Sequence, residues 1–508
     1  MRPHRFNSLP APLEAAIVFL ASLAVLVFFA DRNGYEGDDL NAILPMLTLP
    51  QALQMPENIY KFDWQPLAYW TGYAAYSLTG TIVAIFALSQ IAVAGAIAML
   101  WVIVTRCVGV TGWLFVPILL MFPEILYTGL YYNSSALGFP FAVLAMLLAF
   151  AGPGWGWAAL SGLALGIAVT MRIDYALTVP AIALFQLFLT GSPRDLVITA
   201  AAGLVWLGLS FGVGLLDLGR MLEVYASSRA EIVDRAGQGG WDIQTKLLIA
   251  TTIFSPVGWA VLLIGSGYVA LTATRRLWGM AGLMLLALLP FLYTLQNLLS
   301  VKYLMPVFAL LPVLAALLWR DMTNRLGARL SRIIAGFWGA LSLGLLFAAP
   351  DIDRAPPYLY LTVRDARVIN THDGPRSWGS YLLALYKVER MPPAKGAATR
   401  ETMADAFVTL ARIPGDRTVW MIGDPGFFSP GGLGWNLIYV RLERLDHRGR
   451  PQADGTVHFD LPMGRLVLAS RDGTPPDGTC IVQLESVKDP AEFVRVHCAD
   501  QGQDPGKI

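Results

Sequence analysis

Long apolar stretches, each bounded by short polar or charged segments, dominate the first 350 residues of the chain. A helix that crosses the roughly 30 Å hydrocarbon core of a bilayer needs about 20 mostly apolar residues. We therefore expect an all-α polytopic membrane protein with about eleven transmembrane helices. The predicted helices lie near residues 13–30, 82–105, 111–128, 134–152, 155–171, 174–190, 196–216, 247–270, 277–296, 303–319 and 333–349.

The pattern changes after residue 350. Short apolar runs there alternate with turns rich in Gly, Pro and Asp, which is typical of strands. The sequence thus predicts a transmembrane domain over 1–350 and a C-terminal soluble domain over 351–508, of mixed α/β or mainly β structure. Cys480 and Cys498 lie in this second part; they either form a disulfide or are two unrelated thiols, and the sequence leaves both readings open.

Basic residues in the short loops predict the orientation of the chain. Loops that carry Lys and Arg face the cytoplasm as a rule. The loops at alternate ends of the predicted spans carry Arg2, Arg5, Arg106, Arg194, Arg275, Arg276 and Arg320. This alternation predicts a cytoplasmic N-terminus. The opposite face receives the first external loop, 31–81, the loop 217–246, and the C-terminal domain.

Composition agrees with a membrane protein, because only 14% of the residues are charged, against roughly 25% in a soluble domain. The formal net charge of +1 gives no overall field for binding nucleic acid. The Ala, Gly and Arg-rich composition favours a bacterial inner membrane, which would put the C-terminal domain in the periplasm.

Three carboxylates follow the first predicted span, in the stretch "GYEGDDLNAILP". They are Glu36, Asp38 and Asp39, and the surrounding loop is apolar enough to lie at the membrane interface. One alternative is that Asp39 only caps a helix beginning at Leu40, with the other two acids in solvent. Helix capping would explain one of the three acids and leave the other two unexplained.

Arg172 and Asp174 interrupt the apolar residues between two predicted spans, at a turn that the predicted topology places outside. Ionisable groups at membrane depth are unfavourable unless they are paired or functional. The alternative is that the two residues form an ion pair that merely completes a helical hairpin.

Further cations lie on the same predicted face. Lys302 and Tyr303 stand at the outer end of a span, and Arg229 lies in an external loop of mixed charge. The alternatives are an interfacial lysine with a belt tyrosine, and a solvated loop. Acids in one external loop and cations in the other external segments would suit a site that brings a phosphate group and a hydroxyl group close together. Cations would hold the phosphate while a carboxylate accepts the hydroxyl proton.

In this order the motifs resemble those of the GT-C superfamily of integral-membrane glycosyltransferases. These enzymes use polyprenyl-phosphate sugars, as do the protein O-mannosyltransferases and the aminoarabinose transferase of lipid A. The family's acidic pair in the first external loop is matched at Asp38 and Asp39. Its His-Pro-Pro-Leu-Tyr-like motif is matched in "DWQPLAYW" at Pro66, Leu67 and Tyr69, with Gln65 at one Pro position and Trp64 at the His.

Two further matches extend the resemblance over about residues 10–350. They are the Gly-rich helix and basic turn in "GLALGIAVTMRIDYALTVPAIAL" and the late motif in "VKYLMPVFALLP", where Lys302 replaces an Arg. The chain departs from many relatives between spans three and four, where they carry another acid. Here Asn133, Ser134 and Ser135 offer only neutral hydrogen bonds, and Glu124 is the nearby acid.

The resemblance implies transfer of one sugar from a polyprenyl-phosphate donor to a lipid, polysaccharide or protein acceptor outside the cytoplasm, with inversion at the anomeric carbon. It implies Asp38 as general base, with Asp39 orienting it or binding the acceptor. Expected contacts to the donor phosphate come from Arg172, Lys302 and Arg229. Expected contacts to the substrates come from Tyr69, Gln65, Asp174 and Tyr303. The residues force no particular cofactor; a divalent cation is possible, and Asp38 and Asp39 would hold it.

Other function classes fit the same charges. In a transporter or flippase for a lipid-linked sugar, they would line a translocation path, although the chain shows none of the internal symmetry typical of such folds. A polysaccharide ligase or polymerase would instead join lipid-linked glycans. A non-catalytic scaffold that presents the C-terminal domain would leave the charges without a role.

Overall fold

The structure is a computed structural model of the 508-residue chain. Outside the sheet, it describes residues 11–29, 46, 49–52, 62–81, 83–120, 122, 124–129, 132, 134–222, 305–306, 308–327, 329–330, 332–334 and 336–337. In the sheet it describes residues 419–422, 450–451, 457–461, 464–469, 480–483 and 495–498.

The chain forms two compact units. The first comprises Met1–Ala30, Asp63–Ala68 and Ala87–Val388, and the second comprises Asp31–Phe62, Tyr69–Phe86 and Glu389–Ile508. Most of the described helices belong to the first unit, and the six-stranded sheet belongs to the second. A separate domain over residues 351–508 stays a prediction.

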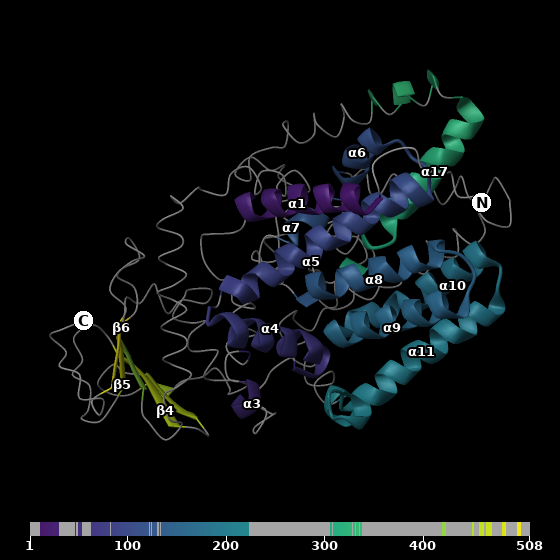
Figure 1. The fold of residues 1–508 in the computed structure, drawn as a ribbon. Coiled ribbons are helices and arrows are strands. Elements are labelled where there is room, and N and C mark those ends of the chain that lie inside the picture. Colours follow the sequence, from purple (N-terminus) through teal and green to yellow (C-terminus); the bar gives the residue numbers. More distant parts are fainter. Residues whose placement is uncertain are drawn as a thin grey trace, which may run out of the picture. The chain divides into compact units, whose positions relative to one another are not determined.

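The described helices follow one another closely along the N-terminal part of the chain (Figure 1). Their bounds are α1 Ala11–Phe29, α3 Leu49–Ala52, η2 Phe62–Trp64, α4 Pro66–Thr79, α5 Val83–Val102, η3 Ile103–Cys107, η4 Gly112–Leu114, α6 Phe115–Leu120, α7 Glu124–Tyr127, α8 Ser134–Phe150, α9 Trp155–Met171, η5 Ile173–Leu177, α10 Val179–Thr190, α11 Pro193–Gly212 and α17 Leu311–Leu326. The η elements are single 3₁₀ turns, except that η3 is a π-helical continuation of α5.

Several predicted spans correspond closely to described helices. Helices α1, α5 with η3, α8 and α9 match the spans predicted from apolar length, to within a few residues at each end. The span predicted over 174–190 divides into η5 and α10, and α11 begins three residues before its predicted start of 196. Two described segments, Val83–Cys107 and Pro193–Gly212, are long and apolar enough to cross a membrane by themselves.

Two predicted spans differ from the structure. The span expected over 111–128 is divided into η4, α6 and α7, and the sequence has Pro123, which cannot donate a helical N–H, just before α7. Helix α17, Leu311–Leu326, extends past the end of the span expected over 303–319. A helix can continue into polar residues after an apolar run has stopped, and hydropathy marks only the end of the apolar run. The predicted spans 247–270 and 277–296, and most of 333–349, lie outside the described residues.

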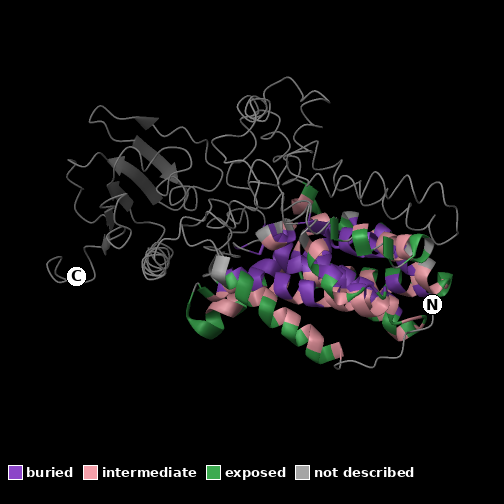
Figure 2. Cartoon of the chain, turned by 90° about the horizontal axis from the view of Figure 1, so that it is seen from above, coloured by how far each residue is buried: buried purple, intermediate pink, exposed green. Residues whose placement is uncertain are grey.

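The core of the first unit lies between helices that are neighbours in sequence. Helix α9 packs against both α8 and α11, and buried residues lie in the interior of the group of helices (Figure 2). Gly162 of α9 permits an especially close approach to α11, since a Cβ there would lie 2.1 Å from the carbonyl oxygen of Thr199. Small residues of this kind let helix backbones pack closely in membranes.

The turn between α10 and α11 shows why the chain reverses direction there. Helix α10 ends at Thr190. The next residue, Gly191, has a left-handed φ of 65°, as is common after a helix. Ser192 then caps α11 by accepting a hydrogen bond from the backbone N–H of Asp195 at 3.2 Å. The Asp195 carboxylate, itself buried, accepts a hydrogen bond from Gly154 N at 3.3 Å, which joins this turn to the start of α9.

An ion pair joins the start of α1 to the end of α5. Arg106 donates from Nε to Glu14 Oε2 at 3.0 Å, and the two side chains form a salt bridge through a second pair of atoms. The contact brings the start of α1 to the end of the continuous helix formed by α5 and η3. Which membrane face this end occupies stays a prediction.

The sheet of the second unit has the strand order β2-β3-β4-β1-β5-β6. The strands are β1 Val419–Ile422, β2 Arg450–Pro451, β3 Val457–Leu461, β4 Gly464–Ala469, β5 Cys480–Gln483 and β6 Arg495–Cys498. Strand β1 lies in the middle and pairs in parallel with both β4 and β5, while the outer pairs are antiparallel. These strands lie between residues 419 and 498; a soluble domain of mixed α/β or mainly β structure there stays a prediction.

Candidate functional site

Both predicted catalytic acids, two predicted phosphate-binding residues and one predicted substrate-binding residue lie outside the part of the chain that the structure describes. They are Asp38, Asp39, Arg229, Lys302 and Tyr303. Their positions and roles stay predictions. The described residues of the candidate site are Arg172, Asp174, Gln65 and Tyr69.

Arg172 stands at the point where α9 stops. Its N–H still donates to Ala168 O at 3.0 Å, as in a helix, but its φ and ψ of −161° and 126° are those of an extended chain. The next residues form the 3₁₀ turn η5, which leads into α10. The extended conformation of Arg172 ends α9 and turns the chain into η5.

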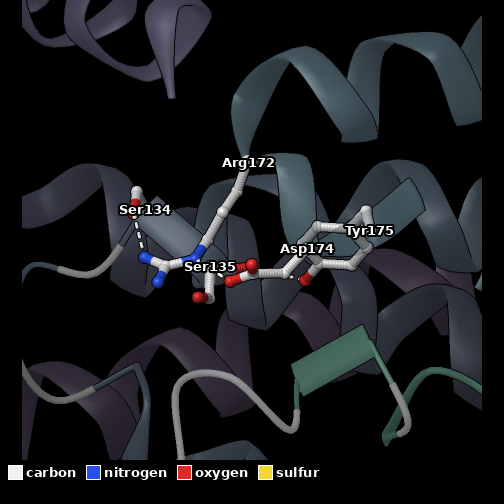
Figure 3. A network of polar contacts seen from close by, with 5 residues as sticks. All are labelled: Ser134, Ser135, Arg172, Asp174 and Tyr175. Carbon is white, nitrogen blue, oxygen red and sulfur yellow. Dashed lines mark hydrogen bonds and ion pairs between the residues drawn. The ribbon is translucent and has the colours of Figure 1, made fainter. Parts of the chain in front are cut away.

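The side chain of Arg172 is held by two oxygen acceptors. Its Nε donates to Asp174 Oδ2 at 2.6 Å, and its Nη1 donates to Ser134 Oγ at 2.8 Å. Ser134 is the first residue of α8, so the contact connects the turn after α9 to the start of the neighbouring helix (Figure 3). The guanidinium lies between the two acceptors.

Tyr175 makes a second connection to the same end of α8. Its side chain is buried, and its hydroxyl donates to the carbonyl oxygen of Ser135 at 2.6 Å. Figure 3 shows Asp174 and Tyr175 side by side along η5, each directed towards the start of α8. Tyr175 is therefore bonded directly to Ser135, and Asp174 is connected to Ser134 through Arg172.

The ion pair is largely shielded from solvent. The side chain of Arg172 is 13% exposed and that of Asp174 is 10% exposed. Partly buried charges need a partner of opposite sign to offset the loss of hydration. The ion pair that the sequence offered as an alternative is therefore present, and the addition of Ser134 makes it a link between helices. A role of Arg172 towards a phosphate stays a prediction.

Chemically, the arrangement offers a fixed guanidinium at the start of a helix. A guanidinium carries five N–H groups in a planar fork that matches the oxygens of a phosphate or carboxylate. The first backbone N–H groups of a helix also favour an anion nearby. The carboxylate of Asp174 offsets part of the positive charge at this place and fixes the orientation of the Arg172 guanidinium.

Gln65 and Tyr69 lie in the segment that leads into α4. Gln65 is buried, and its carbonyl oxygen accepts a hydrogen bond from Ala68 N at 3.1 Å, which closes the first turn of the helix. Tyr69 is fully buried, with its ring 5.6 Å from that of Phe62. The motif match placed both residues at a substrate, and that assignment stays a prediction.

The described residues hold no group of three or more His, Cys, Asp or Glu that could bind a metal ion. Asp38 and Asp39, the residues expected to hold any divalent cation, are not among them. The candidate metal site is therefore still a prediction from sequence.

Sequence reasoning assigned no site role to Ser134 or Tyr175. Ser134 was recognised only as a source of neutral hydrogen bonds, because nothing in the sequence pairs it with a residue 38 positions away. Tyr175 directly follows Asp174. The signal in the sequence that could have indicated its role is a polar aromatic residue next to a charge within an apolar stretch. Both residues stabilise the turn that carries Arg172.

Comparisons with known proteins find similarity in structure alone. No family model matches the sequence, and no curated protein matches it. The structure is similar to that of ArnT from Cupriavidus metallidurans bound to undecaprenyl phosphate, with a TM-score of 0.52 and 14% identity, over 80% of this chain and 82% of that one. The apo form of the same protein has a TM-score of 0.47 and 14% identity, over 82% and 87% of the two chains.

At this level of identity the first comparison shows the fold. It extends over most of both chains, well beyond any one helical hairpin. The chain therefore shares a helical fold with ArnT.

Proposed function

We propose that the protein is a membrane glycosyltransferase that transfers one sugar from a polyprenyl-phosphate donor to an acceptor hydroxyl. The observation that carries the proposal is the similarity in fold to ArnT, whose structure holds undecaprenyl phosphate. The acidic and basic motifs of the sequence support the same reading, because they follow the order found in such enzymes. The site would face the extracytoplasmic side of a bacterial inner membrane.

The proposed reaction is a direct displacement at the anomeric carbon. Asp38 accepts the proton of the acceptor hydroxyl, and the acceptor oxygen forms a bond to the anomeric carbon from the face opposite the phosphate. The bond between that carbon and the phosphate oxygen breaks, and polyprenyl phosphate leaves with the electron pair. Because the leaving group is already a stable anion, no carboxylic acid is needed to protonate it, unlike in most glycosidases.

The remaining residues have roles in binding. Asp39 orients the base or the acceptor, and a divalent cation, if used, would bind at this pair of acids. The donor phosphate is bound by Arg172, Lys302 and Arg229. The sugar or lipid is contacted by Gln65, Tyr69 and Tyr303.

We assign Asp174 a different part from the substrate contact that the motif match implied. Its carboxylate lies 2.6 Å from Arg172 Nε and is largely shielded from solvent. A carboxylate in that position orients the guanidinium, and the hydroxyl of Ser134 holds Nη1 at 2.8 Å. Asp174 and Ser134 thus act as positioning residues for the phosphate-binding Arg172.

The substitution Asp38→Asn tests the proposal. Membranes containing the full-length protein are incubated with radiolabelled undecaprenyl-phosphate sugars, and new glycosidic bonds to endogenous acceptors are measured. The amide cannot accept the proton, so transfer should fall at least 100-fold, in line with the usual contribution of a general base. Glu36→Gln, which removes a charge from the same loop, is the matched control and should transfer normally.

The same assay separates the rival functions. Full transfer by Asp38→Asn would exclude this base. If label crosses the bilayer with no new glycosidic bond, the protein is a transporter and the proposed function is wrong. Transfer of preassembled glycan chains in place of single sugars would instead indicate a ligase or polymerase.

A further inference from the structure

Two of the three cysteines of the chain stand opposite each other in the six-stranded sheet. Strands β5 and β6 pair in antiparallel fashion, and the register makes Cys480 the direct partner of Cys498. The sequence alone left open whether these two residues form a disulfide or are two unrelated thiols. The strand register supplies a relation between them.

Directly opposed positions in an antiparallel pair satisfy the distance requirement of a disulfide. They lie on the same face of the sheet, with Cα atoms about 4.5 or 5.5 Å apart, depending on whether the pair is hydrogen-bonded. Disulfides join residues whose Cα atoms are about 4.4–6.8 Å apart. Both kinds of opposed position fall within that range, so no backbone movement is needed.

The position in the sheet gives such a bond a structural purpose. Among the described strands, β6 is at the edge of the sheet and pairs with β5, whereas β5 also pairs with β1. An edge strand of four residues is held by few backbone hydrogen bonds. A covalent bond to β5 would fasten it to the middle of the sheet.

We propose that Cys480 and Cys498 form an intrachain disulfide in the mature protein. The thiolate of one cysteine attacks the disulfide of an oxidising thiol–disulfide oxidoreductase and forms a mixed disulfide. The second cysteine then displaces the enzyme sulfur, so that the two cysteines lose two electrons and two protons and the oxidant leaves as a dithiol. This requires an oxidising compartment, which agrees with the predicted extracytoplasmic location of this part of the chain.

Peptide mapping of the full-length protein tests the proposal. Membranes are quenched in acid, free thiols are blocked with N-ethylmaleimide under denaturing conditions, and the protein is digested with trypsin without reduction. Cleavage after Arg471, Lys488, Arg495 and Lys507 yields peptides 472–488 and 496–507, each with one cysteine. We expect these two peptides to appear joined in mass spectra, and to separate after reduction.

Matched cysteine variants make the result specific. Cys480→Ser should abolish the joined peptides and leave Cys498 open to alkylation, whereas Cys107→Ser, in η3 of the other unit, should leave them unchanged. Alkylation of both cysteines in the unreduced wild-type protein would overturn the proposal. So would a bond between two copies of the chain, seen as a covalent dimer on a non-reducing gel. Neither outcome bears on sugar transfer.

Discussion

Gly138 of α8 lies against the ring of Tyr175, so closely that a Cβ at position 138 would be 2.5 Å from Cε2 of the tyrosine. Only glycine leaves room for this ring, whose hydroxyl bonds to the carbonyl of Ser135 one turn earlier. The turn that carries Arg172 is therefore fitted to the surface of α8 by a glycine as well as by hydrogen bonds.

Gly138→Ala should consequently destabilise the protein. The added methyl group would force the buried ring of Tyr175 to shift, and overpacking of this kind usually costs about 1–3 kcal/mol. The thermal unfolding midpoint in detergent should fall. Gly95→Ala in α5 is the matched control, because nothing lies within 4 Å of a Cβ there. Equal midpoints for the two variants would contradict the packing described.

Gly162→Ala should separate α9 from α11. The carbonyl oxygen of Thr199, 2.1 Å from the position of the new Cβ, belongs to the backbone and cannot rotate away. We expect a lower unfolding midpoint, and faster proteolysis of the segment that contains α11. Gly208→Ala, on α11 itself with open space around its Cβ, should behave like the wild type. If both variants are equally stable, the helices do not approach at Gly162.

Arg172→Lys should weaken binding of undecaprenyl phosphate by about tenfold, or roughly 1.4 kcal/mol. Lysine keeps the positive charge and can still pair with Asp174, but it lacks the planar fork that binds phosphate oxygens in parallel. Native mass spectrometry of the purified protein with added lipid measures the effect. Arg194→Lys, at an exposed position near the start of α11, is the control. Unchanged lipid affinity together with an unchanged unfolding midpoint would remove Arg172 from the phosphate site.

The ion pair between Glu14 and Arg106 predicts a charge-reversal rescue. Glu14→Arg brings two cations together at the junction of α1 and α5, and should lower the amount of folded protein in membranes. Arg106→Glu alone should do the same with two acids. The double variant restores opposite charges and should recover folded protein, measured by fluorescence-detected gel filtration. Failure of the double variant to exceed both single variants would mean that the pair does not join these helices.

Much of the helical architecture could be predicted from sequence, because an apolar run of span length has few alternatives in a membrane. Helices α8 and α9 begin at the residues that hydropathy indicated. The divided segment from η4 to α7 was missed, since its residues are as apolar as those of a span. Its interruption depends on local backbone chemistry that a hydropathy window averages out.

The candidate site was predictable residue by residue but not as a set of contacts. Arg172 and Asp174 stand out in the sequence as charges between apolar runs. Their link to Ser134 depends on how α8 and α9 pack, and the fit of Tyr175 depends on a missing side chain at Gly138. Such relations between distant positions leave no mark in a single sequence.

The order of strands in the sheet has a consequence for how the protein is made. Strand β1 is synthesised first and lies in the middle, but its two neighbours, β4 and β5, follow only after about 40 and 60 further residues. Pairing over such separations is slow, because the intervening chain must close into loops before any contact forms. During translation, β1 therefore lacks the partner strand of at least one edge until β5 has emerged, and this interval is when the nascent chain is most open to aggregation or to a chaperone.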